Sequence, residues 1–142
     1  MIVLDVNVLV AAFRGEHPHH LPVHTWLGHA LHDEDAVVVP DLSWVGFLRI
    51  TTNNRVFEVP ATLEQAVAFM AAVTGSAGYR PVPGLFGDWA GFVDLASEAR
   101  VTGNLVPDAY LAAIALGLAC PIATMDRDFR RFPGLKIIDP AA

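Results

Sequence analysis

The N-terminal segment MIVLDVNVLV constrains the fold most, because it has the composition of a buried strand but contains an acid. Its apolar residues are mainly β-branched, which is typical of a central strand in a parallel sheet. A carboxylate that is taken out of water without a partner lowers the stability of a fold substantially. We therefore expect Asp5 to lie near the C-terminal end of a strand over residues 2–6 and to have a partner there.

Strand-like and helical segments alternate along the rest of the chain. The expected strands cover residues 2–6, 36–40, 121–124 and 136–139, with at most a short edge strand at 80–84. The expected helices cover 7–14, 17–33 after a turn, 42–52, 88–101 and 107–118, and one more runs from a cap at Thr62, with Gln65 completing a capping box, to Gly75. This order predicts an α/β fold: a mainly parallel central sheet in a three-layer α/β/α arrangement, in one domain over residues 1–142.

Composition narrows the class of protein further. The chain has 142 residues, 54% of them hydrophobic, which is enough for one packed core and argues against disorder. A single cysteine, Cys120, allows no disulfide within the chain and fits a reducing cytoplasm. No basic segment with a cleavage site begins the chain, so we expect no signal peptide.

The most apolar stretch, LVPDAYLAAIALGLACPIATM, is about as long as a membrane span, but it contains Asp108 and Pro121. We interpret it as a buried helix followed by a strand and expect no membrane contact. The net charge of −6 argues against a protein that holds nucleic acid by bulk charge alone. This negative charge is compatible with an enzyme whose acidic residues bind a divalent cation.

Acids from distant parts of the chain are expected at one edge of the sheet. Asp5 and Asp126 follow strands, Asp128 lies two residues further on, and Asp108 lies in the first turn of the helix that leads into strand 121–124. Functional crevices of open parallel sheets lie outside the carboxyl ends of the strands. Taken singly, each acid also fits an ordinary helix N-terminus or loop.

Such a cluster needs a proton or a cation. Two carboxylates ~5 Å apart repel by roughly 3 kcal/mol at an effective dielectric constant of ~20. Either one carboxylate stays protonated or a divalent ion sits between them. Carboxylate oxygens suit Mg²⁺ or Mn²⁺, and such sites serve phosphoryl chemistry.

Four stretches carry a resemblance to a known family: VLDVNVLV, LSWVGFLRITTNNRVF, VPDAYLAAIA and ATMDRDFRRF. In this order and spacing the chain resembles PIN domains, specifically ribonuclease toxins of the VapC type, over essentially its whole length. The resemblance implies a ribonuclease that cleaves RNA phosphodiesters with metal-activated water and uses Mg²⁺ or Mn²⁺. It also implies a toxin with a cognate VapB-type antitoxin, a homodimer and a cytoplasmic location.

The resemblance also implies roles for individual residues. By position, Asp5, Asp108 and Asp126 match the acids that bind metal and carry catalysis, and Asp128 matches a frequent additional ligand. Asn7 and Thr124 match polar residues that orient carboxylates or water.

One departure from the family pattern affects the expected number of bound ions and the expected nuclease activity. Relatives usually have a glutamate in the second block, two residues before Gly-Phe, and Trp44 occupies that place here. Asp41 either compensates or serves as the N-cap of the helix that starts near Leu42, and the second interpretation is favoured. With Trp44 expected as a packing residue beside the acids, the alternative function is a weakly active or inactive module that binds RNA or a partner. A metal-dependent DNA nuclease or phosphatase is a third candidate.

For several other polar and aromatic residues, the sequence allows both a functional role and a purely structural or solvent-exposed one. His20 and His24 have the i, i+4 spacing of a two-ligand zinc face, but exposed histidines on an amphipathic helix are favoured. Arg49 either approaches phosphate or pairs with an acid at the edge of the site. Two further groups fit nucleic-acid contact as well as solvent or core positions: the arginines Arg127, Arg130 and Arg131, and the tryptophans Trp26, Trp44 and Trp89.

Overall fold

A four-stranded parallel sheet forms the centre of the molecule. The computed structural model describes residues 1–33, 36–82 and 88–142. The strands are β1 (Ile2–Leu4), β2 (Val37–Val38), β3 (Ile122–Ala123) and β4 (Ile137–Ile138). Their order in the sheet is β2-β1-β3-β4, and every neighbouring pair is parallel. The N-terminal strand is therefore central, as its apolar sequence predicts.

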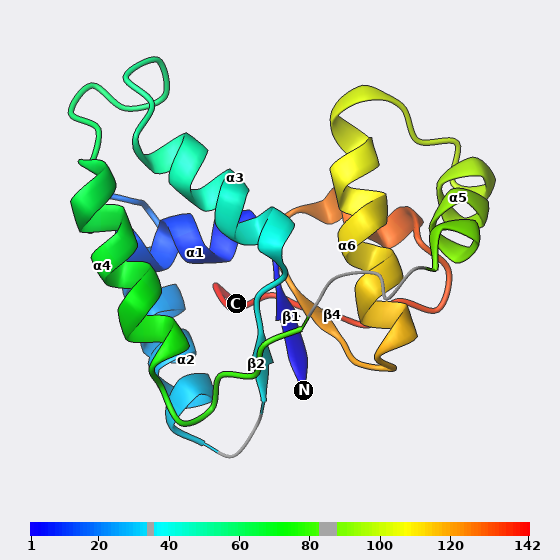
Figure 1. Ribbon diagram of the computed structural model, residues 1–142, viewed down its shortest axis with the longest axis horizontal. Coiled ribbons are helices and arrows are strands. Elements are labelled where there is room, and N and C mark those ends of the chain that lie inside the picture. The colour runs from blue at the N-terminus through cyan, green and yellow to red at the C-terminus, as the bar shows by residue number, and fades with distance from the viewer. Residues whose placement is uncertain (34–35, 83–87) are drawn as a thin grey trace.

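Helices cover both faces of this sheet. They are α1 (Val6–Phe13), α2 (His20–His32), α3 (Asp41–Thr51), α4 (Leu63–Thr74), α5 (Trp89–Glu98) and α6 (Val106–Gly117), with the 3₁₀ turns η1 (Gly103–Leu105) and η2 (Arg127–Arg131). In Figure 1, α1 to α4 lie to the left of the sheet, and α5 and α6 lie to its right. The predicted three-layer α/β/α arrangement is confirmed.

Alternate strand residues supply two separate cores. Leu4, Val37 and Ala123 pack with α1, α2, α3 and α4 in one core. Val3 and Ile122 pack with α6 and η2 in the other. Successive side chains of a strand point to opposite faces of its sheet, so even these short strands serve both layers.

Several local predictions are confirmed. Gln65 N donates to Thr62 Oγ1 at 3.1 Å and Thr62 N donates to Gln65 Oε1 at 2.9 Å, which completes the capping box of α4. The apolar stretch from Leu105 forms α6 and then β3. Within the described part of the chain, no helix is long and apolar enough to cross a membrane.

The strands are shorter than the sequence predicts. β1 ends at Leu4 because the Asp5 side chain caps α1, which then begins at Val6. In place of an edge strand at 80–84, a single parallel bridge joins Tyr79 to Val37. Residues 83 and 84 lie outside the described residues.

Candidate metal centre

The register of β1 and β3 places Asp5 beside Thr124. Leu4 pairs with Ala123, so the next residue of each strand lies at the C-terminal edge of the sheet. Thr124 Oγ1 donates to Asp5 Oδ2 at 2.7 Å, and Val6 N donates to Asp5 Oδ1 at 2.7 Å. The buried carboxylate thus has a partner on each oxygen, which explains how an acid is tolerated after a central strand.

Thr124 and Asn7 link this carboxylate to the segment after β3. The hydroxyl of Thr124 accepts from Asn7 Nδ2 at 3.2 Å and from Asp126 N at 3.0 Å, while it donates to Asp5. Met125 N donates to Asn7 Oδ1 at 3.3 Å. These bonds fix the backbone that carries Asp126 relative to the N-terminus of α1.

Three further carboxylates converge next to this network. One oxygen each of Asp108, Asp126 and Asp128 lies within 4.8 Å of the others. Asp108 comes from the first turn of α6, whereas Asp126 is the N-cap of η2 and accepts from Asp128 N at 2.9 Å. The structure therefore brings together the four predicted acids, with Asp5 on the buried side of the cluster.

Burial, followed by the crowding of negative charge, raises the pKa of two of these groups. The pKa of Asp108 is raised from 3.8 to about 7, first by its removal from water and then by the charges of Asp5, Asp126 and Asp128. Burial also raises the pKa of Asp5, and its hydrogen bonds from Thr124 and Val6 oppose this shift. A divalent cation would relieve the repulsion, and a purely carboxylate donor set fits Mg²⁺ or Mn²⁺.

The acids border a cavity of about 430 Å³ between α1, α3 and α6. His17 and Arg49 lie on its wall, together with Asp5, Asp108 and Asp126. A larger cavity of about 810 Å³ lies between the end of α1 and residues 56–61. We assign the site to the smaller cavity because it contains the carboxylates.

The family to which this chain belongs follows from its sequence. A family model described as PIN domain matches residues 2–135. The chain belongs to the PIN-domain family. It is 43% identical to Ribonuclease VapC31 and 41% identical to Ribonuclease VapC25, both of Mycobacterium tuberculosis, over 140 residues that make up 99% of each chain. The predicted resemblance is confirmed.

Solved structures show the same PIN fold. The crystal structure of VapBC2 from Rickettsia felis, bound to a DNA fragment from its promoter, contains a chain that matches with a TM-score of 0.70 at 16% identity. The match covers 97% of this chain and 98% of that chain.

The α3 helix of this PIN domain presents a different face to the cavity than the sequence predicts. Trp44 is only 4% exposed and packs against Phe47 in the core, at a ring-centroid distance of 5.8 Å. Its packing role is confirmed, but it does not line the cavity. The α3 residues that do are Leu42, Val45, Gly46, Arg49 and Ile50. A glutamate at position 44 would therefore point into the core, away from the acids.

Asp41 does not join the cluster. It is the first residue of α3, the N-cap is Pro40, and no side chain in the described part of the chain caps this helix. The interpretation of Asp41 as an N-cap is therefore wrong by one residue. The exposed Asp41 side chain does not line the acid cavity.

His17 is a cavity residue that sequence reasoning missed. It belongs to the turn between α1 and α2, and burial, followed by the charge of His19, lowers its pKa. No spacing rule connects it with the acids, because the turn is brought back to the sheet edge by packing of α1 against α2. Of the arginines after Asp126, Arg131 lies 3.7 Å from Asp128 Oδ1, and all three are exposed.

Proposed function

We propose that this chain is a ribonuclease toxin that hydrolyses RNA phosphodiesters and depends on Mg²⁺ or Mn²⁺. The observation that carries the proposal is the approach of Asp108, Asp126 and Asp128 to within 4.8 Å, beside Asp5. The full-length similarity to proteins named VapC ribonucleases supports the reaction class. We further propose that residues 1–142 act as one domain in the cytoplasm.

The carboxylates of Asp5, Asp108, Asp126 and Asp128 would hold the cation. When bound, a divalent ion neutralises their charge, polarises the phosphate and lowers the pKa of water. Thr124 and Asn7 hold the Asp5 and Asp126 segments at a fixed separation through the bonds described above. They are positioning residues, and they limit the reorganisation that binding of a cation would otherwise require.

The opposite wall of the cavity is suited to the substrate. Arg49 supplies a guanidinium group to a phosphate of the RNA at the rim. His17 accepts from His19 N through Nδ1 at 3.0 Å, so its neutral ring carries the proton on Nε2. His17 is thereby available as an uncharged donor to a ribose or phosphate oxygen.

One observation favours the alternative function of a weakly active binding module. None of the five α3 residues that line the cavity is an acid. Among the described residues, the cluster of carboxylates therefore comes from the junction of β1 and α1, from α6, and from the start of η2. In this alternative the site binds RNA or a partner with a loosely held cation and cleaves slowly.

The proposed partners are a VapB-type antitoxin and a second copy of the chain. The antitoxin is proposed from the similarity of this chain to VapC proteins and from its match to a solved toxin–antitoxin complex. A homodimer is suggested by α5, which has no buried residue and exposes Trp89 and Val93 at 59% and 53%. Sedimentation of the wild type and of a Trp89→Ser variant tests the dimer.

The function is tested by incubating the tag-free protein with total RNA and mapping new ends. We expect cleavage with Mn²⁺, none with EDTA, and no cleavage of single-stranded DNA of similar length. Cleavage that persists in EDTA would refute the metal dependence. RNA binding without cleavage under all conditions would support the binding module instead.

A further inference from the structure

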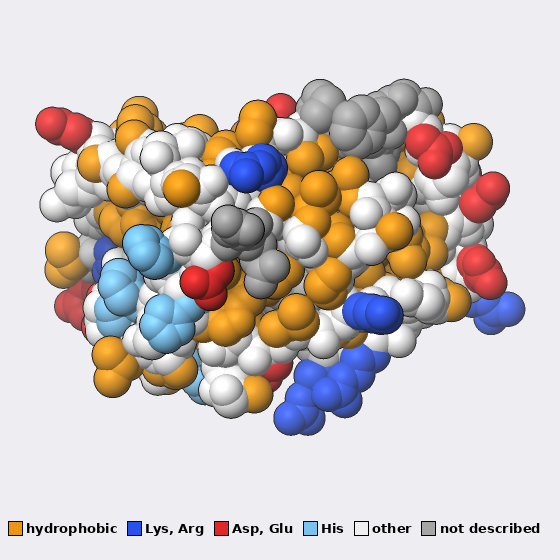
Figure 2. All heavy atoms as spheres, turned by 90° about the horizontal axis from the view of Figure 1, so that it is seen from below, with side chains coloured by type: hydrophobic (Ala, Val, Ile, Leu, Met, Phe, Trp, Pro, Cys, Tyr) orange, Lys and Arg blue, Asp and Glu red, His pale blue; other side chains and the backbone are white. Residues whose placement is uncertain are grey.

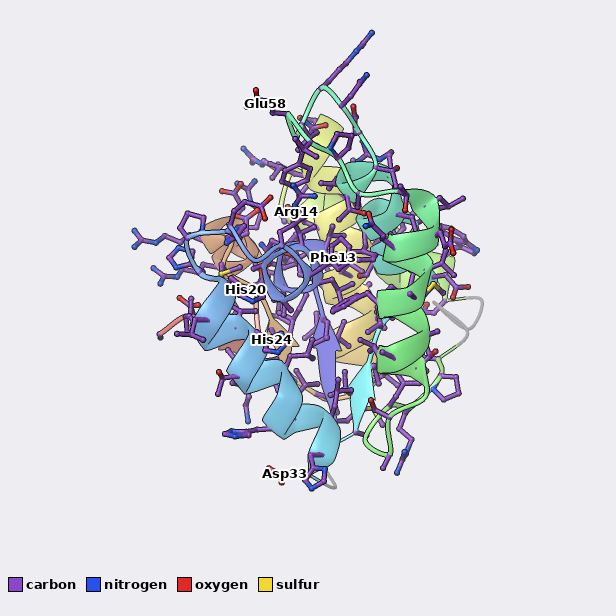
Figure 3. All side chains as sticks on the ribbon, turned by 90° about the vertical axis from the view of Figure 1, so that its left-hand side faces the viewer. Phe13, Arg14, His20, His24, Asp33 and Glu58 are labelled. Atoms are coloured by element: carbon purple, nitrogen blue, oxygen red, sulfur yellow. The ribbon has the colours of Figure 1, made fainter. Side chains whose placement is uncertain are left out.

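Two histidines of α2 form a pair outside the acid cavity. His20 and His24 are one helical turn apart, with ring centroids separated by 5.1 Å and planes tilted by 35°. Figure 3 shows both side chains on the side of α2 that faces α1, whereas Asp33 lies at the other end of the helix. His20 is half-buried and His24 is exposed, so solvent reaches the pair.

The last turn of α1 fixes the orientation of both rings. His20 Nδ1 lies 2.9 Å from the carbonyl oxygen of Ala11, and His24 Nδ1 lies 3.2 Å from that of Ala12. A carbonyl oxygen only accepts hydrogen bonds, so each Nδ1 carries the proton. In the neutral ring the lone pair is then on Nε2. A backbone carbonyl that holds Nδ1–H is the usual anchor of a metal-binding histidine.

We propose that His20 and His24 form a second cation site, which binds a transition-metal ion such as Zn²⁺ through the two Nε2 atoms. Imidazole nitrogens suit Zn²⁺, Ni²⁺ and Cu²⁺, whereas the carboxylate cluster suits Mg²⁺ and Mn²⁺. Among residues 1–33, 36–82 and 88–142, no third histidine, cysteine or acid completes a ligand group with this pair. Water or a side chain of a partner fills the remaining positions.

The other histidines provide a contrast within the same chain. Figure 2 shows histidine side chains gathered on one half of the molecule, where Figure 1 places α2. His17 has the opposite tautomer, because its Nδ1 accepts from His19 N. His29 is exposed on the last turn of α2 and serves as a control for nonspecific binding.

The test is a zinc titration of tag-free protein in millimolar Mg²⁺, repeated with Asp126→Asn to weaken binding at the carboxylates. His20→Asn and His24→Asn are the informative variants, because the amide nitrogen of Asn replaces Nδ1 as donor to the carbonyl while the Nε2 ligand is lost. We expect each to weaken zinc binding at least tenfold and to keep the melting temperature close to that of the wild type. His29→Asn should leave zinc affinity unchanged.

Long-range ¹H–¹⁵N spectra of histidine-labelled protein give a second readout that needs no variant. In metal-free protein, the neutral form of both rings should be the Nδ1–H tautomer, and Zn²⁺ should shift their Nε2 resonances. Zinc affinity that is unchanged in either Asn variant, or Nε2–H tautomers in the metal-free protein, would overturn the site. Neither result depends on whether RNA is cleaved.

Discussion

At the scale of single residues, one hydroxyl group organises the acid edge of the sheet. Thr124 Oγ1 donates to Asp5 and accepts from Asn7 and from the backbone of Asp126. The hydroxyl thus uses its donor and both lone pairs at a buried position. Through this single oxygen atom, Asp5 near the N-terminus and Asp126 near the C-terminus are held next to each other.

Thr124→Val should therefore affect both stability and activity. The change leaves the partners of the hydroxyl unsatisfied at an almost unchanged side-chain volume, and we expect a loss of about 1–3 kcal/mol in the free energy of unfolding. RNA cleavage per folded molecule should fall about tenfold or more, as for lost supporting contacts of a metal site. Thr124→Ser keeps the hydroxyl and is the matched control. Equal rates in both variants would exclude a positioning role.

Asp108 makes the stability of the metal-free protein depend on pH. The folded protein retains a proton on Asp108 up to about pH 7, whereas the unfolded chain releases it near 3.8. The contribution of this group to stability is therefore greatest below pH 3.8 and decreases as the pH rises to about 7.

Chemical denaturation of wild type and Asp108→Asn in EDTA measures this contribution. From pH 4 to pH 7, the wild type should lose on the order of 1–2 kcal/mol relative to the variant, since solvent screens a half-exposed carboxylate. Saturating Mn²⁺ should remove the loss. Parallel stability curves of the two proteins would show that Asp108 is not in the crowded environment described here.

At the scale of elements, the orientation of α3 decides which side chains reach the cavity. Trp44 and Phe47 face the core, while Val45, Gly46 and Arg49 face the acids. The indole Nε1 of Trp44 has no hydrogen-bond partner among residues 1–33, 36–82 and 88–142, so within this part of the chain Trp44 contributes by packing.

Trp44→Glu should therefore destabilise the protein and leave metal affinity unimproved. A carboxylate at this position replaces a packed aromatic ring with a buried charge, and we expect a loss of about 3 kcal/mol or more. Trp44→Phe removes only the unpaired N–H and part of the ring, so it should cost less than about 1.5 kcal/mol. Thermal melts with and without Mn²⁺ distinguish these outcomes, and tighter Mn²⁺ binding by Trp44→Glu would contradict the placement of α3.

Gly46 sets the distance between α3 and the start of α1. A Cβ atom at this position would lie 2.9 Å from Cγ2 of Val6, the residue whose N–H binds Asp5. Gly46→Ala should cost about 1–3 kcal/mol through overpacking, and Val6→Ala in the same chain should restore part of it. A double-mutant cycle of unfolding free energies measures the coupling, and strictly additive effects would argue against the contact.

The alternation of strands and helices could be predicted from apolar periodicity, because each element has its own spacing. Strand lengths could not, because the capping of α1 by Asp5 and the brevity of each pairing depend on tertiary contacts. The convergence of the acids followed from the rule that parallel strands end at one edge. Which side chains of α3 line the cavity, and the position of His17 beside the acids, could not be predicted. Both depend on how the helices are rotated and packed in the fold.

At the scale of the whole molecule, the sheet separates two cores, and the acids lie where β1, α6 and η2 meet at its edge. The net charge of −6 adds to the local repulsion, so the protein has little affinity for RNA by charge alone. In the function proposed here, a divalent cation would supply the positive charge that an RNA phosphate requires at this edge. The central claim is thus that the carboxylates are present because they carry out the proposed function, and that their mutual repulsion lowers the stability of the fold.

The rate of RNA cleavage per folded molecule, compared between wild type and Asp108→Asn in Mn²⁺, tests this claim most directly. We predict that the variant cleaves at least about a hundredfold more slowly, while its melting temperature without metal at pH 7 is equal to or higher than that of the wild type. The variant loses a ligand and a repulsive charge together, so activity and stability should change in opposite directions. A destabilised variant that keeps the full rate per folded molecule would contradict the account.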